Sequence, residues 1–373
     1  MATKRSGIAS ITMLRLLPAV VVSVAMALNL ISQVDNPRPA NRERFSPGLQ
    51  LEESHETPGP GSARLEAGPD SPASATIRFL QSIPEPEGAS ERKSLFQRLK
   101  EVFFEKSDET KLIRPLGLLV VKEILYVTDP GSHGVFLFDL KTNSIEKITS
   151  VGKQELVSPI GIAVTEDRIF LSDSYLRQVF VYDRNFRFLH PFTDHLLERP
   201  TALAWNEKLA KLYVADTAAH HILVYKPDGT LEKTIGERGT GPGEFNFPTH
   251  LWLDPNGTLV VVDSLNYRVQ RFRGDGVFLG EFGQQGDGSG DFSSPKGIAS
   301  DSRGNVYVVD ALFDAVQIFD PDGGLLFGFG ERGMGPGQFW LPNGLFIDAR
   351  DRIFVADSYN RRIQVFEFLR RGR

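Results

Sequence analysis

The sequence predicts an all-β protein that folds as a six-bladed β-propeller of four-stranded antiparallel blades. From Pro115 onward, six segments of the chain repeat one frame. Within each segment, apolar and polar residues alternate with a period of two, which indicates strands rather than helices. Short strands joined by glycine-rich turns, in a repeat of about 45 residues, are typical of propeller blades.

Two markers stay in phase through the six repeats. Each repeat begins at a proline, at positions Pro115, Pro159, Pro200, Pro248, Pro295 and Pro342. Each repeat also holds a strand that ends in aspartate, and these residues are Asp129, Asp173, Asp216, Asp263, Asp310 and Asp357. Their spacing is 44, 43, 47, 47 and 47 residues. Because the aspartate recurs in every repeat, we interpret it as a cap of the following turn rather than a catalytic group.

The fifth repeat shows the expected strands most clearly. We predict strands over residues 297–300, 306–309, 315–319 and 325–329. The intervening segments are rich in Asp, Gly and Ser, and glycine supplies the positive φ that tight hairpin turns require. The apolar residues of one blade need those of the next, so a single repeat would not fold alone.

The fourth and sixth repeats carry motifs that resemble a known family. Their glycine runs read GERGTGPGEFNFP and GERGMGPGQFWLP, and their turns read VVDSLNYRVQRF and VADSYNRRIQVF. These motifs resemble the NHL repeat, and the resemblance covers roughly residues 114–369. It implies a six-bladed propeller over residues 114–373. The first three repeats lack most of the glycine run, which marks where a binding surface would be individual.

The N-terminal third predicts export and a tether. Lys4, Arg5 and Arg15 precede an apolar run over residues 16–31, so residues 1–34 are expected to be a signal peptide or an N-terminal membrane anchor. We therefore expect an exported protein, either periplasmic or extracellular, or held at the membrane by this segment. Residues 35–74 are rich in Pro, Gly and Ser without apolar periodicity, and they predict a disordered linker.

Residues 75–113 are expected to complete the propeller. The sixth repeat contains only three strands, and an open sheet edge invites aggregation. Residues 75–83 alternate apolar and polar side chains, and we predict that they form the outer strand of the last blade. Residues 94–106 place five apolar side chains on one helical face, which predicts an amphipathic helix packed on the propeller.

Candidate binding residues fall on one edge of the predicted ring. Four residues after each strand-ending aspartate the chain carries His133, Arg177, His220, Tyr267, Asp314 and Arg361. They are either solvated turn residues or a ligand-facing rim, to which Trp340 adds an aromatic ring. In the channel, His250 stands where glycine is commoner, and Asn343 follows a leading proline. A structural role for His250 is the alternative.

The composition limits the chemistry. The chain has no cysteine, which excludes thiolate metal sites and cysteine nucleophiles, and its net charge of −5 disfavours nucleic acid as a partner. Related six-bladed families include amidating lyases, with zinc-binding histidines after the prolines, and lactonases, with Glu, Asn and Asp ligands. In this chain the residue after each proline is neither a histidine nor a carboxylate: Leu116, Ile160, Thr201, Thr249, Lys296 and Asn343. Only Asn343 matches a ligand type of the lactonases.

We therefore predict no cofactor, no metal and no catalytic residue. The expected function is a non-catalytic interaction scaffold that binds a protein, peptide or glycan on its loop-rich face. The alternative is a hydrolase or lyase with its site in the channel. The N-terminal segment would add contact with a membrane if it is not cleaved.

Overall fold

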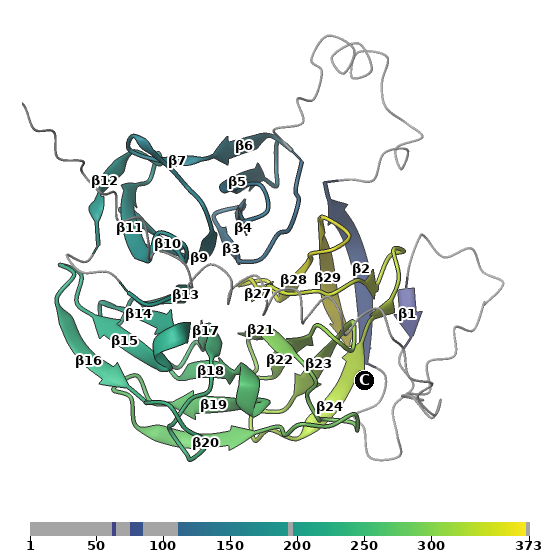
Figure 1. The fold of residues 1–373 in the computed structure, drawn as a ribbon. Helices are drawn as coiled ribbons and strands as arrows, with labels where there is room; N and C mark the ends of the chain where they lie inside the picture. The colour runs from purple at the N-terminus through teal and green to yellow at the C-terminus, as the bar shows by residue number, and fades with distance from the viewer. Residues whose placement is uncertain (1–61, 65–74, 85–110, 193–196, 371–373) are drawn as a thin grey trace, which may run out of the picture. The chain divides into compact units, whose positions relative to one another are not determined.

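The computed structural model describes residues 62–64, 75–84, 111–192 and 197–370, and these residues form a β-propeller (Figure 1). The predicted signal or anchor segment and the predicted helix over residues 94–106 lie outside the described residues. Among those described, no helix has the length and hydropathy needed to cross a membrane. Six antiparallel sheets follow one another along the chain, one for each repeat of the sequence.

The first three blades each contain four strands, numbered from the channel outward. They are β3 (Leu118–Val121), β4 (Ile124–Asp129), β5 (Gly134–Asp139) and β6 (Ile145–Ile148); β9 (Pro159–Val164), β10 (Arg168–Asp173), β11 (Gln178–Asp183) and β12 (Phe188–Pro191); and β13 (Pro200–Asn206), β14 (Lys211–Asp216), β15 (His221–Tyr225) and β16 (Leu231–Ile235). A small hairpin of β7 (Ser150–Val151) and β8 (Gln154–Glu155) precedes the second blade.

The last three blades repeat this arrangement. They are β17 (Pro248–Leu253), β18 (Leu259–Asp263), β19 (Arg268–Phe272) and β20 (Phe278–Phe282); β21 (Pro295–Ser300), β22 (Val306–Asp310), β23 (Ala315–Phe319) and β24 (Leu325–Phe329); and β27 (Leu345–Ile347), β28 (Arg352–Asp357) and β29 (Arg362–Arg370) with an N-terminal strand described below. The four strands predicted for the fifth repeat are thus confirmed to within two residues at each end.

Short elements occupy the loops between these strands. Two 3-10 turns, η2 (Thr217–Ala219) and η3 (Ser264–Asn266), follow the strand-ending aspartates of the third and fourth blades. A short parallel pair, β25 (Glu331–Arg332) and β26 (Gln338–Phe339), lies in the glycine run before the sixth blade.

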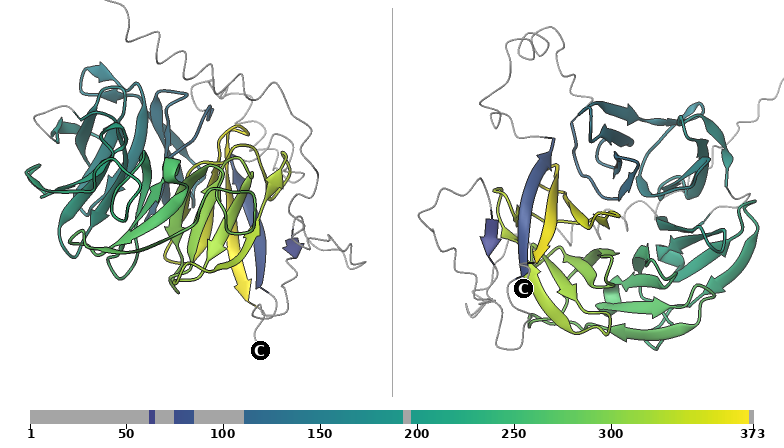
Figure 2. Two further views of the ribbon diagram at one scale, coloured as in Figure 1. Left: turned by 60° about the horizontal axis from the view of Figure 1, so that its bottom comes forward. Right: turned by 180° about the vertical axis from the view of Figure 1, so that it is seen from behind.

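The sixth blade brings together strands from the two ends of the described chain. β2 (Ala75–Ile83) pairs antiparallel with β29, and Ile77 lies opposite Phe368 (Figure 2). β1 (Ser62–Arg64), which falls within the predicted linker, pairs with the outer side of β2. The sheet therefore has five strands, and β2 is its fourth rather than its outermost strand.

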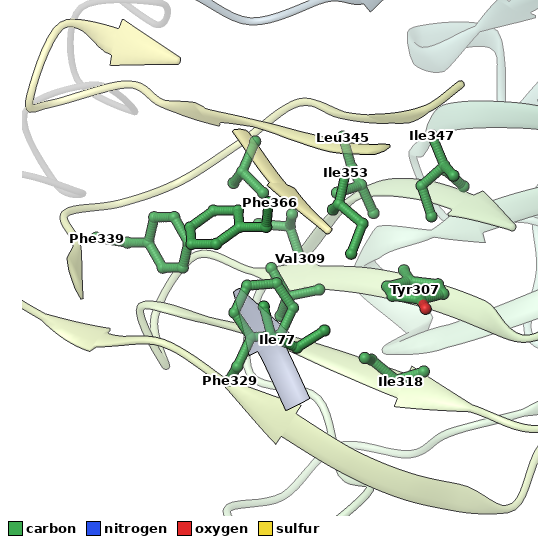
Figure 3. Close-up of a cluster of buried hydrophobic side chains, with 13 residues drawn as sticks. Ile77, Tyr307, Val309, Ile318, Phe329, Phe339, Leu345, Ile347, Ile353 and Phe366 are labelled. Atoms are coloured by element: carbon green, nitrogen blue, oxygen red, sulfur yellow. The ribbon is translucent and has the colours of Figure 1, made fainter. Parts of the chain in front are cut away.

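The hydrophobic core is divided into six clusters, each lying between two neighbouring blades. One cluster joins β22 and β23 of the fifth blade to β28 and β29 of the sixth, and Ile77 of β2 belongs to it (Figure 3). Another joins the sixth blade to the first through side chains such as Phe354 and Leu125. Because each sheet buries both faces against its neighbours, the inner strands read as continuous apolar runs, and no blade is stable alone.

The six strand-ending aspartates cap backbone N–H groups, as the sequence predicted. The Asp173 carboxylate accepts hydrogen bonds from Val157 and Ser158, in the loop before Pro159, and from Tyr175 and Leu176 in the following turn. All six carboxylates are buried, between 0% and 2% exposed. A buried carboxylate is tolerated only when it is hydrogen-bonded. Each aspartate accepts an N–H group from the loop before the leading proline, and Asp129, Asp173 and Asp310 also accept N–H groups from the following turn, as the sequence predicted for all six.

Candidate functional site

The inner strands begin at the same edge of the ring as the turns that follow the aspartates. Pro200 pairs with Asp216 and Pro248 with Asp263, so the loops before the prolines and after the aspartates meet there. We call this edge the loop face. In the second to fifth blades the inner strand has a bulge directly after its proline. Bulges redirect side chains, here toward the channel.

The second position after the proline controls how closely inner strands approach one another. A Cβ atom on Gly161 would lie 2.1 Å from the Thr201 carbonyl oxygen, and one on Gly344 would lie 1.7 Å from that of Leu116. Glycine is therefore required where neighbouring inner strands touch. The third and fourth blades carry Ala202 and His250 at this position instead, so the strands that follow them cannot approach as closely.

A cavity of about 360 Å³ lies between the inner strands. Near the loop face its polar lining consists of Arg199, Thr201, Thr249, His250, Lys296 and Asn343. Farther along the same strands its lining is apolar and aromatic, and includes Leu119, Val164, Trp205, Trp252, Leu253 and Phe346. The Trp252 indole N–H donates to Ser300 Oγ at 2.8 Å, and its ring meets Phe346 edge to face at 5.5 Å. The cavity therefore has one polar end and one apolar end.

The polar end carries positive charge. Burial lowers the pKa of His250 to about 4, so this imidazole is neutral at pH 7. Burial also lowers the pKa of Lys296, and the nearby Arg199 guanidinium adds to that effect while Asp310 opposes it. None of the described residues that line the cavity is an Asp or a Glu. The structure thus brings the predicted His250 and Asn343 together with Lys296 and Arg199, which sequence reasoning did not select.

The six residues at the fourth position after the aspartates share one backbone conformation. Each has positive φ, between 52° and 59°, at the end of its turn. His220 and Tyr267 end η2 and η3 in this way. Arg361 is exposed, whereas Tyr267 packs in part against the core between the fourth and fifth blades.

Four of these side chains contact the loop that leads into the next blade. His133 Nδ1 lies 2.6 Å from the Val157 carbonyl oxygen, and Arg177 Nε donates to Leu197 at 2.6 Å. The Phe247 N–H donates to His220 Nδ1 at 3.2 Å. The Leu341 N–H donates to Asp314 Oδ1 at 2.7 Å. The structure therefore gives these four positions a role in joining neighbouring blades, beside any contact with a ligand.

The loop face also displays a recurring apolar position, of which the sequence had indicated only Tyr175 as an aromatic side chain on this face. The second residue after the aspartate is large and apolar in four repeats, and is 49% to 70% exposed in each: Tyr175, Leu265, Leu312 and Tyr359. We call these four side chains the crown. The sequence already contains this pattern, because each of the four residues is the second one after a capping aspartate. Trp340 extends the crown, since its ring lies 5.3 Å from that of Tyr359 and 5.3 Å from the Arg332 guanidinium.

Within the described part of the chain, no group of three or more His, Cys, Asp or Glu side chains is placed to hold a metal ion.

Comparison with known proteins agrees with the fold. Residues 186–281 and 299–370 match the sequence model of a family described as a six-bladed β-propeller. No curated protein matches the sequence.

Solved structures with low sequence identity have the same fold. An auxiliary nutrient binding protein from Bacteroides thetaiotaomicron superposes with a TM-score of 0.55 at 16% identity, over 69% of this chain and 70% of that one. A catalytically inactive virginiamycin B lyase from Staphylococcus aureus, solved with quinupristin, gives 0.53 at 12% identity, over 71% and 98%. A chain of the nidogen/laminin complex gives 0.51 at 18% identity, over 65% and 86%. The prediction of an all-β, six-bladed propeller is therefore confirmed.

Proposed function

We propose that this chain is an exported, non-catalytic propeller of NHL type that binds a protein, peptide or glycan on its loop face. The observation that carries the proposal is the crown, four exposed apolar side chains at equivalent positions on one edge of the ring. Tyrosine and tryptophan are enriched among the side chains that carry the binding energy of protein interfaces, and the crown contains two tyrosines, with Trp340 beside it. Export rests on the apolar run over residues 16–31, and cell fractionation of the full chain tests it.

The crown is held in place before any partner arrives. Asp173 accepts the N–H group of Tyr175, and Asp310 accepts that of Leu312. Both carboxylates are fully buried, so the turns that display these side chains are anchored to the blades. A preorganised surface loses less conformational entropy on binding than a flexible one does. The Trp340 ring, which contacts the Arg332 guanidinium and the Tyr359 ring, supplies a larger aromatic anchor beside them.

Proteins of this fold include both binders and enzymes. The nutrient binding protein and the nidogen/laminin complex are named for binding, and the lyase is named for catalysis. A hydrolase or lyase with its site in the channel is our second candidate. The observation that favours this second candidate is that the His250 and Lys296 side chains line the same cavity. The crown favours the first candidate because a channel reaction would not require it.

Substitution of the crown tests the proposal. We expect Leu312→Ser and Tyr359→Ser each to weaken capture of the partner by more than about fivefold, or about 1 kcal/mol. Val277→Ser is the matched control, since Val277 is also exposed but lies in a turn between the third and fourth strands of its blade, at the opposite edge. The measurement is a quantitative pull-down from the exported fraction, with melting temperatures to verify folding. Loss of capture by the control alone would show that the opposite edge binds the partner.

A further inference from the structure

We propose that the central cavity binds an organic anion, with a carboxylate or phosphate head group at the polar end and an apolar body at the other end. The site lies between the inner strands, whereas the crown lies on the turns around them. This inference is independent of the proposed function because it involves none of the crown residues. The cavity volume of about 360 Å³ falls in the usual range for small-molecule sites.

Two cations that are not paired with any described residue define the head-group end. Neither the Lys296 ammonium nor the Arg199 guanidinium forms a hydrogen bond or ion pair with any described residue, and both line the cavity. The nearest carboxylates are already occupied. Asp310 accepts N–H groups from Ser293 and Ser294, and Asp216 accepts that of Arg199 itself. A buried cation is costly unless it is paired, so an oxyanion would stabilise this end.

Electrostatic repulsion between the two cations supports this assignment. Arg199 contributes to the lowered pKa of Lys296, which places the two positive charges close enough to destabilise each other. An anion between them would convert this repulsion into two attractions. The Arg199 side chain is exposed to solvent, whereas Lys296 is half-buried.

Neutral polar groups surround the same end. His250 and Asn343 each lack a side-chain hydrogen bond to a described residue, although both line the cavity. The amide of Asn343 can donate to an oxyanion, and so can one ring nitrogen of a neutral imidazole. His250 occupies a position where four other blades have glycine, so it adds a polar side chain to the cavity lining that glycine would not supply.

The apolar end of the cavity selects the length and the apolar character of the ligand body. Trp252 lies two residues beyond His250, and Phe346 lies three residues beyond Asn343. At about 3.3 Å per strand residue, the aromatic lining is roughly 7 to 10 Å from the polar end. Burial of a hydrocarbon body against these rings is favourable at about 25 cal/mol for each Å² removed from water. A chain of six to ten carbons would span about this distance.

Calorimetric titration of the full chain tests the inference with four probes. We expect octanoate or octyl phosphate to bind, and comparison of these two distinguishes a carboxylate head from a phosphate head. We expect 1-octanol, which has the same body without charge, to bind at least tenfold more weakly. Acetate, which has the charge without the body, should also bind at least tenfold more weakly. Equal binding of octanol and octanoate would refute the role of the cations.

Three variants with equal change in net charge locate the site. We expect Lys296→Gln to weaken binding of the octyl anion at least tenfold and Arg199→Gln at least threefold. Lys226→Gln should remain within twofold of the unmodified chain, since Lys226 is exposed in a turn at the opposite edge. Arg199 is exposed, so its replacement tests the site even if Lys296→Gln fails to fold. The inference is overturned if neither octyl anion binds at millimolar concentration, or if Arg199→Gln binds as tightly as the unmodified chain.

Discussion

At the scale of single residues, His250 is the most unusual feature of the channel. Four of the six repeats have glycine at its position, and a Cβ atom at those glycines would collide with the next blade. In the fourth blade His250 takes the place of this glycine, and its side chain lines the cavity. The consequence is an imidazole removed from water with two cations, Lys296 and Arg199, lining the same cavity. Removal from water disfavours its protonation.

We expect His250 to make stability depend on pH. The pKa of His250 is about 4 in the folded chain and about 6.5 when unfolded, so between these values the unfolded state binds more protons. Stability is therefore complete above pH 6.5 and is lost as the pH falls toward 4. By this linkage the folded chain should lose about 2 kcal/mol between pH 7 and pH 5. Urea unfolding of the unmodified chain and of His250→Gln measures the difference; parallel pH profiles would contradict this account.

Arg268 is a second residue with a large expected effect. Its guanidinium pairs with the buried Asp263 at 2.9 Å and donates to the carbonyl groups of Thr240, Gly241 and Glu244. It therefore ties a glycine run to its blade. We expect Arg268→Met to lower the free energy of unfolding by about 3 kcal/mol, because the buried Asp263 carboxylate would lose its ion-pair partner and the Thr240 carbonyl oxygen would lose its hydrogen-bond donor.

A matched control lies five residues farther along the chain. Arg273 also pairs with an aspartate, Asp275, but both side chains are more than half exposed. Exposed ion pairs contribute little to stability. We therefore expect Arg273→Met to leave the urea midpoint unchanged, and an equal loss in both variants would mean that burial is not what makes the Arg268 pair important.

At the scale of elements, β2 shows how one strand can serve two purposes. It pairs with β29 along its length, and its inward side chains join the core between the fifth and sixth blades. A bulge after Phe79 turns Leu80 outward, where it is 40% exposed. The strand thus covers an open sheet edge and completes a hydrophobic cluster at the same time.

Two substitutions on β2 test its part in the blade. Ile77→Asp should lower the free energy of unfolding by at least about 3 kcal/mol, because it places a charge in a core where Ile77 is 3% exposed. Leu80→Asp should have no measurable effect. Urea unfolding of both variants measures the difference in their free energies of unfolding. If Ile77→Asp is as stable as Leu80→Asp, β2 does not belong to the folded blade.

At the scale of the whole molecule, the sixth blade must meet the first. Ser358 Oγ donates to the Pro115 carbonyl oxygen at 2.6 Å, and Arg352 pairs with Glu123 at 3.1 Å. A hydrophobic cluster shared by the two blades lies beside these contacts. Ser358 repeats a bond made elsewhere in the ring, such as that from Ser264 Oγ to Pro295. Closure therefore uses a contact that recurs at other junctions, those of the third with the fourth blade and of the fourth with the fifth.

Gly344→Ala tests this junction directly. Its Cβ atom would lie 1.7 Å from the Leu116 carbonyl oxygen, so the two inner strands would have to separate. We expect a loss of about 3 kcal/mol in the free energy of unfolding. Gly241→Ala is the control, because its Cβ atom would meet only the flexible carboxylate of Glu244 at 3.2 Å. Equal urea midpoints for these two variants would show that the junction can open without cost.

The sequence by itself determined the repeat, the strands and the capping role of the aspartates. Alternation along β22 and β23 and the turn residues between them are local properties, so the strand bounds could be predicted from neighbouring residues. The aspartate caps could be predicted because the same local geometry recurs in every repeat. His250 was selected for the same reason, as a departure from glycine at a repeated position.

Only the tertiary structure decided which side chains meet. Arg199 precedes the third inner strand and Lys296 belongs to the fifth, so nothing local to either residue indicates that they line one cavity. The hydrogen bonds of His133 and Arg177 to the next blade depend likewise on how the blades pack. Strand pattern is determined by the chain on either side of a residue, whereas a channel exists only once six blades have closed around it.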